Sequence, residues 1–158
     1  MTWSEVEHTL TRLPRPAAAG LAARSARPTL PAVTALEPRY GPEAAEWLAA
    51  CEAALAKVEA FARGEPVSRF QLDLAADAAR CAATATANAA RQVGPSPLIE
   101  AAELAYAAVA FAADCARAAT PQRAAMFGMQ SLRAAAGGGE VPTELAEALK
   151  TTDTSPTR

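Results

Sequence analysis

The stretch PLIEAAELAYAAVAFAADCARAA, residues 97–119, decides the fold of this chain. On a helical wheel at 100° per residue its charged residues fall in one strip about 100° wide. They are Glu100, Glu103, Asp114 and Arg117. The rest of the circumference is apolar and mostly alanine. A helix apolar around most of its circumference must contact neighbours on several sides, so we predict an all-α domain with this helix at its centre.

The composition indicates one domain with a core rich in small residues. The chain has 158 residues, of which 51% are hydrophobic, and this suffices for a single core. Because alanine is a strong helix former and a weak hydrophobe, the core should gain from close helix approach more than from bulky side chains. We predict a single helical domain over residues 1–150. The polar residues 151–158 are predicted to be a disordered tail.

Capping signals divide the chain into a compact bundle of about four main helices with short helices at both ends. Ser68 with Gln71 forms a capping box, and Gly64 just before it is a helix stop. The main helices are predicted over residues 42–63, 68–93, 97–119 and 121–136. The connection GPSP, residues 94–97, supplies a helix stop, a turn and a new N-terminus. Helices 68–93 and 97–119 are therefore predicted to form an antiparallel pair.

The N-terminal part is harder to interpret. A first helix is capped by Thr2 or Ser4 and ends before Pro14, because proline is not tolerated inside a helix. Repeated prolines then interrupt residues 14–41. Two readings remain open for this segment, namely short helices over residues 17–25 and 31–37, or an irregular segment wrapped around the bundle.

The charge distribution argues against two classes of partner. The net charge is -2 with interspersed signs, which gives no electrostatic footprint for nucleic acid or an anionic membrane. The apolar stretch 97–119 carries four charges, and this is too many for a membrane span. The start, MTWSEVEHTL, lacks the apolar run of a secretory signal. We therefore expect a cytoplasmic protein with no nucleic acid and no membrane partner.

Residues that could carry chemistry are few. His8 is the only histidine, which excludes a two-histidine metal site or a histidine-based triad within one chain. Cys51, Cys81 and Cys115 are widely spaced, and each falls on or beside an apolar helix face, so we predict buried, reduced thiols. Residues 137–139 are three glycines without the lysine of a phosphate loop. We predict no catalytic residue, no cofactor and no metal, and hence no enzyme.

Charged side chains on helices 42–63 and 68–93 form the candidate partner surface, because we expect the fold not to need them. Within this set, Asp77 and Arg80 are three residues apart and are predicted to pair along a solvated stripe. The surface comprises Glu46, Glu52, Lys57, Glu59, Asp73, Asp77, Arg80 and Arg91. Thr84, Thr86 and Asn88 interrupt the alanine-rich face of helix 68–93, and the sequence alone does not explain them.

Three Ala-rich segments carry a resemblance to a known group. They are WLAACEAALAKVEAFARGE (47–65), AADAARCAATATANAAR (75–91) and AAELAYAAVAFAADCARAA (101–119). Together they resemble immunity proteins of bacterial polymorphic-toxin systems with an Ala-rich helical fold. The resemblance implies a protein that occludes a toxin, and it assigns no functional residues.

Three functional hypotheses follow from the sequence. The first is a small binding protein that acts by protein–protein contact, for which an immunity-like antagonist of a toxin is one version. The second is a structural helical homo-oligomer. The third is a bundle that binds a small molecule, with a pocket near Tyr106, Met126 and Met129, although core filling is the simpler role for these side chains.

Overall fold

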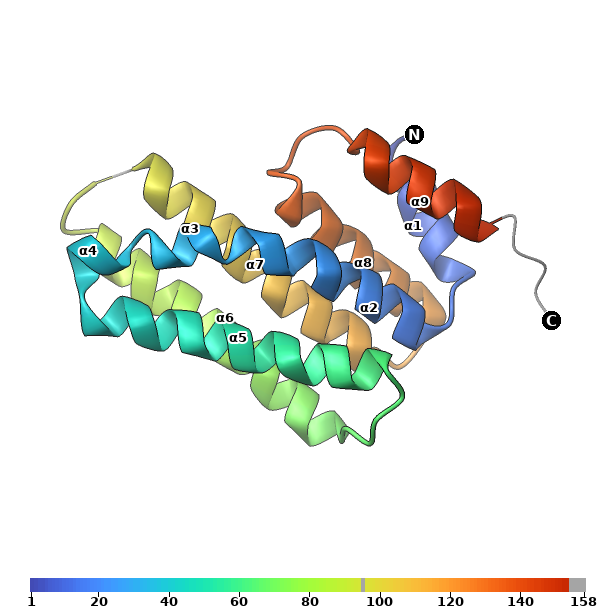
Figure 1. The fold of residues 1–158 in the computed structure, drawn as a ribbon, viewed down its shortest axis with the longest axis horizontal. Helices are drawn as coiled ribbons and strands as arrows, with labels where there is room; N and C mark the ends of the chain where they lie inside the picture. The colour runs from blue at the N-terminus through green and yellow to red at the C-terminus, as the bar shows by residue number, and fades with distance from the viewer. Residues whose placement is uncertain (95, 154–158) are drawn as a thin grey trace.

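The computed structural model describes residues 1–94 and 96–153, and over these residues it contains helices and turns without a strand. The predicted all-α class is confirmed (Figure 1). The helices are α1 Trp3–Thr11, α2 Arg15–Ala26, α3 Pro31–Thr34, α4 Glu37–Tyr40, α5 Pro42–Ala62, α6 Arg69–Ala90, α7 Pro97–Arg117, α8 Pro121–Ala135 and α9 Thr143–Asp153, with a 3-10 turn, η1, at Arg27–Thr29.

The central position predicted for residues 97–119 is correct. α7 packs against α2, α3, α5, α6 and α8, and 12 of its 21 residues are buried. Small residues let these neighbours approach closely. A Cβ atom added at Gly128 would lie 3.2 Å from Leu10 Cδ1 and 3.4 Å from Cys115 Sγ. The Ala-rich sequence therefore gives close helix contacts in place of bulky side chains.

The N-terminal proline-rich segment contains a full helix, so a bundle of four main helices is one helix too few. α2 is 12 residues long, buries Ala18, Ala19, Ala22 and Ala23 among others, and packs against α5, α7 and α8. Pro16 does not break it, because it lies in the first turn, where the missing N–H has no partner to lose. The remainder, from η1 to α4, is a series of short turns of helix. Of the two open readings, short helices over residues 17–25 and 31–37 is therefore the correct one, although the first of these helices is longer than predicted.

The predicted caps and the antiparallel pair are also present. Ser68 Oγ accepts from the Gln71 N–H at 3.1 Å, and Gln71 Oε1 accepts from the Ser68 N–H at 3.0 Å. α6 and α7 lie side by side over much of their length (Figure 1). α6 ends at Ala90, whereas the predicted helix extends to residue 93. The reason is that residues 91–93 turn toward Gly94, whose φ is +84°.

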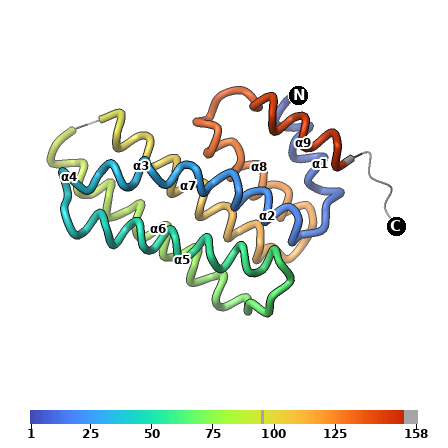
Figure 2. Tube along the Cα trace, viewed as in Figure 1, coloured from blue at the N-terminus to red at the C-terminus, as the bar shows by residue number. Residues whose placement is uncertain are grey.

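α1 and α9 cover one end of the bundle. They contact each other, and the N-terminus lies beside α9 (Figure 2). The Trp3 indole N–H donates to the Gly139 carbonyl at 2.7 Å and so fixes the glycine loop between α8 and α9. Residues 151–153, predicted as part of a disordered tail, form the end of α9, and the rest of that tail lies outside the described residues. Over the described ranges, no helix combines the length and apolar character needed to cross a membrane.

Candidate functional site

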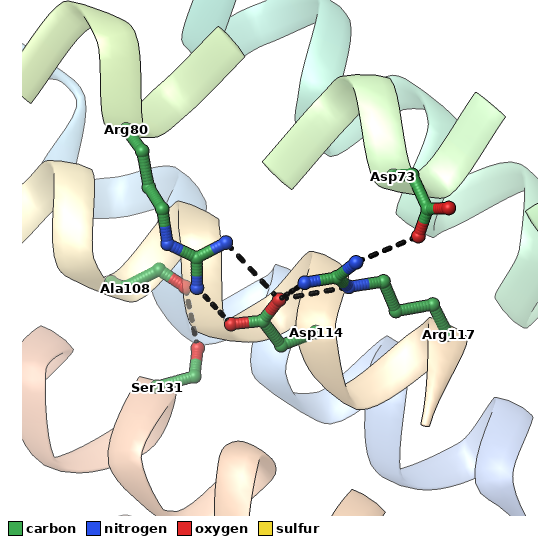
Figure 3. A network of polar contacts seen from close by, with 6 residues as sticks. All are labelled: Asp73, Arg80, Ala108, Asp114, Arg117 and Ser131. Atoms are coloured by element: carbon green, nitrogen blue, oxygen red, sulfur yellow. Dashed lines mark hydrogen bonds and ion pairs between the residues drawn. The ribbon is translucent and has the colours of Figure 1, made fainter. Parts of the chain in front are cut away.

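A buried carboxylate joins α6 to α7. The Asp114 side chain on α7 is only 1% exposed, and arginines approach it from both helices (Figure 3). From α6, Arg80 Nη1 donates to Asp114 Oδ1 at 3.3 Å, and Arg80 Nη2 pairs with Oδ2. From α7, Arg117 Nε donates to Oδ1 at 3.0 Å. Both carboxylate oxygens thus accept charge-assisted hydrogen bonds, which offset the cost of removing the charge from water.

The network continues to a second carboxylate. Arg117 Nη1 donates to Asp73 Oδ1 on α6 at 2.7 Å (Figure 3). The hydrogen bond that Arg117 donates to Asp73, and after it the interactions with Asp114, raise the pKa of the Arg117 guanidinium above its ordinary value. Arg80, Asp114, Arg117 and Asp73 are hereafter called the ion network. It crosses between α6 and α7 twice and so joins the two helices through polar contacts.

This arrangement corrects two expectations for the candidate partner surface. The predicted Asp77–Arg80 pair is wrong, because Arg80 turns toward Asp114. The physical reason is the difference between two free energies. Leaving a buried carboxylate unpaired costs several kcal/mol, whereas an exposed ion pair contributes about 1 kcal/mol or less. Asp73 and Arg80 are also not spare charges, because they hold α6 against α7.

The other charges of that surface fall into two groups. Glu59 on α5 accepts from Arg27 Nε at 3.2 Å and also pairs with Arg27 Nη2, so it anchors η1 and belongs to the fold. Exposed side chains without such a role include Asp77 on α6 and Arg91, its C-terminal cap. Neither Asp77 nor Arg91 forms an ion pair within the described part of the chain. Glu46, Glu52 and Lys57 are exposed along α5.

Buried hydroxyl groups add two interhelical contacts that the sequence did not reveal. Thr86 Oγ1 lies 2.9 Å from the Ala82 carbonyl, to which it donates, and 2.7 Å from Tyr106 Oη. Because a threonine has a single hydroxyl proton, Tyr106 must donate to Thr86. Burial raises the pKa of Tyr106 to about 12. Ser131 on α8 donates to the Ala108 carbonyl on α7 at 2.7 Å (Figure 3).

The three thiols divide into two kinds. Cys51 and Cys115 are fully buried, as predicted, and burial raises the pKa of each thiol to about 12. The prediction is wrong for Cys81, which is exposed. Its side chain is four residues after Asp77 and three before Thr84, both exposed, so all three share the outward side of α6.

The outward side of α6 is unusual in its apolar content. Phe70 and Leu74, one turn apart, are 68% and 52% exposed. Beyond them is a shallow hollow lined by Asp77, Arg80, Cys81, Thr84, Ala85 and Asn88. We define the α6 outer face as Phe70, Leu74, Asp77, Cys81, Thr84 and Asn88. Thr84 and Asn88, which the alanine pattern left unexplained, are therefore surface residues of this face.

The remaining candidates are His8 and the side chains near the predicted pocket. His8 lies on α1 with its Nε2 3.1 Å from Arg12 Nη2. No group of three or more histidine, cysteine or acidic side chains able to hold a metal ion occurs in residues 1–94 and 96–153. Met129 and Phe127 pack against the core, and the Phe127 ring lies 6.3 Å from that of Phe111. These contacts are those of core-filling side chains.

Comparison of the chain with known protein families, with curated proteins and with solved structures finds no match. The resemblance to immunity proteins therefore stays a prediction. The chemistry of the α6 outer face and the geometry of the ion network are the observations on which a functional argument can be based.

Proposed function

We propose that this protein binds another protein and that the α6 outer face is its contact surface. The observation that carries the proposal is the exposure of Phe70 and Leu74, at 68% and 52%. Two large apolar side chains one turn apart favour contact with a partner, because covering them removes apolar surface from water. Aromatic side chains also contribute disproportionately to protein interfaces.

The fold does not use these side chains. On the opposite side of α6, Leu72, Ala75 and Ala79 are buried, and the ion network adds polar contacts to α7. α6 is thus attached to the bundle without Phe70 or Leu74. The exposed charge of Asp77 lies beside them and would favour a partner carrying a complementary cation.

We extend the proposal by two statements that the sequence suggested. The first is that the protein acts in the cytoplasm, and the second is that it antagonises a toxin in the manner of an immunity protein. Co-expression with any growth-inhibiting protein that a neighbouring gene encodes would test the second statement. If the wild-type chain restores growth and the variant Phe70→Gln with Leu74→Gln does not, the statement is supported. If the wild-type chain leaves the growth inhibition unchanged, the statement is contradicted.

A binding experiment tests the general proposal. Immobilised wild-type chain should retain a partner from native-host extract at physiological salt, and the partner should be reconstituted as a purified protein. The variant Phe70→Gln with Leu74→Gln should bind it at least 10-fold more weakly, since each lost apolar contact contributes about 1–2 kcal/mol. The control variant Glu46→Gln with Lys57→Gln changes exposed charges on α5 and should bind like wild type. Equal binding by all three proteins would contradict the proposal.

A further inference from the structure

We infer that the partner of the α6 outer face is a second copy of this chain, with the two α6 helices antiparallel about a two-fold axis near Thr84. This inference rests on the proposed function and specifies its partner. Of the large hydrophobic side chains exposed in the described part of the chain, four lie between residues 70 and 98, namely Phe70, Leu74, Val93 and Leu98. The first two lie near the N-terminal end of α6, and the last two follow its C-terminal end in the turn and at the start of α7, which is the distribution that an antiparallel self-contact needs.

The charges fit this register. Asp77 and Arg91 are each seven residues from Thr84, or about 10 Å along a helix at 1.5 Å per residue. An antiparallel pair centred on Thr84 therefore places Asp77 of one copy opposite Arg91 of the other. Seven residues is close to two helical turns, so all three side chains lie on the same side of α6. A two-fold axis makes the contact twice, once for each copy.

The intramolecular pairing leaves these two charges available. Arg80 is committed to Asp114, so Asp77 lacks the partner that helical spacing would offer it. Asp77 and Arg91 are exposed and have no ion pair within the described residues. A parallel arrangement in register would instead place Asp77 against Asp77, and the repulsion would oppose it. The charges therefore select the antiparallel orientation.

The apolar side chains fit the same register. Leu74 lies near the N-terminal end of α6 and Val93 in the turn just after its C-terminal end, so an antiparallel contact brings these two ends, with their exposed side chains, toward each other. Phe70 extends further outward, toward the end of the second copy where Leu98 is exposed. Between these ends, Cys81, Thr84 and Ala85 are small and line the shallow hollow. Small central side chains let two helix axes approach to about 8–10 Å.

Charge reversal gives the sharpest test. By light scattering from micromolar to millimolar chain concentration, wild type should move from monomer mass to dimer mass. Asp77→Arg alone, or Arg91→Asp alone, places two like-charge pairs in the contact and should weaken dimerisation at least 10-fold. An equimolar mixture of these two variants should form a heterodimer, because both contacts then join opposite charges. The double variant Asp77→Arg with Arg91→Asp should dimerise like wild type.

Cys81 provides an independent measurement of the register. With the axis at Thr84, the two Cys81 Cα atoms are offset by about 9 Å along the helices and lie roughly 12 Å apart. That distance exceeds the reach of a disulfide, which needs Cα atoms within about 7 Å. A bis-maleimide with a spacer of matching length should cross-link wild type, whereas an oxidant alone should not. Cys81→Ser should abolish the cross-link, because Cys51 and Cys115 are buried.

The outcomes separate this inference from the proposed function. Monomer mass up to millimolar concentration would overturn the self-contact, and loss of a purified heterologous partner on changing Phe70 and Leu74 would then still support protein binding. A dimer that neither single charge reversal weakens would overturn the register. A dimer unaffected by Phe70→Gln with Leu74→Gln would overturn both the inference and the surface assigned to the function.

Discussion

Neighbouring helices of this bundle break the ordinary burial rule in opposite ways. α7 buries a carboxylate, Asp114, at 1% exposure, whereas α6 exposes an aromatic ring, Phe70, at 68%. Charged groups are almost never fully buried unless paired, and exposed apolar patches mark contact surfaces. The first exception is resolved inside the chain, by Arg80 and Arg117. The second has no intramolecular resolution, and this difference locates the functional proposal on α6.

Arg80 connects the two exceptions. Its guanidinium could have paired with Asp77 along α6, but it reaches across to the buried carboxylate of Asp114. The core thereby gains a satisfied charge and the α6 outer face retains an unpaired one. One helix thus carries both the ion network, which joins α6 to α7, and the proposed contact surface.

The largest effect is expected from leaving the buried carboxylate unpaired. Replacing Arg80→Met and Arg117→Met together should lower the free energy of unfolding by about 3–5 kcal/mol, as is typical when a buried charge loses its partners. Adding Asp114→Leu to that background should recover most of the loss, because the buried charge is then removed. Urea unfolding, monitored by circular dichroism, measures the free energy of unfolding of each variant.

A matched arginine at the C-terminal end of α6, Arg91, sharpens that test. Arg91→Met removes an exposed guanidinium without an ion pair in the described chain and should change the free energy of unfolding by less than about 0.5 kcal/mol. If the double arginine variant is as stable as wild type, the ion network does not stabilise the α6–α7 contact, and the contrast between the two sides of α6 fails.

The thiols extend the contrast to pH. In the folded chain the pKa of Cys51 and Cys115 is raised to about 12 from an ordinary 9.0. The unfolded chain loses these protons first, so their contribution is fully present below pH 9 and is lost as pH rises from 9 toward 12. The expected loss is about 1.4 kcal/mol per pH unit for each thiol, or roughly 3 kcal/mol for both at pH 10.

Substitution separates the buried thiols from the exposed one. Urea unfolding at pH 8, 9 and 10 should show a shallower pH dependence for Cys51→Ala with Cys115→Ala, with a residual slope from the buried Tyr106. A maleimide reagent should label Cys81 within minutes in the native protein and the other two thiols only after unfolding. Fast native labelling of Cys51 or Cys115 would contradict the assigned burial.

The alanine contacts of α7 provide a further comparison. Ala105 is fully buried and Ala101, one turn earlier, is exposed. Ala105→Leu should overpack the core and lower the free energy of unfolding by about 1–3 kcal/mol. Ala101→Leu should change it by less than about 0.5 kcal/mol. The pair is measured by thermal unfolding, and equal melting temperatures for both variants would mean that α7 is less enclosed than the fold requires.

Local signals in the sequence predicted most of the fold. They failed for features that contacts between helices determine. The helix class, the capping box at Ser68 and the centrality of residues 97–119 follow from periodicity and caps, which are local. The sequence leaves α2 undecided between a short helix over residues 17–25 and an irregular segment, because proline at a helix start and proline in a helix interior look alike in the sequence, although only the second breaks a helix. The direction of Arg80 depends on the depth of Asp114, which no spacing within α6 reveals.

The candidate surface shows the same limit. Asp77 and Arg91 were identified from polar periodicity, but Phe70 and Leu74 were not, because two apolar residues near the start of an amphipathic helix are ordinarily assigned to the core. Their exposure depends on which neighbours α6 has, and its main contacts are with α5 and α7. Apolar residues on α6 cover more of the helix circumference than one buried side needs. That excess is the sequence signal that could have identified this face.

The smallest expected change in stability is also the strictest test of the comparison. Phe70→Gln with Leu74→Gln should alter the free energy of unfolding of the dilute monomer by less than about 0.5 kcal/mol, because both side chains are already in water. The matched control is Leu72→Gln, which places an amide where a side chain is 2% exposed and should cost about 2–4 kcal/mol. Chemical denaturation at micromolar chain concentration keeps self-association out of the measurement. A large loss in the free energy of unfolding for Phe70→Gln with Leu74→Gln would mean that the fold itself uses these two side chains. The α6 outer face would then belong to the core and would not be a contact surface for a partner.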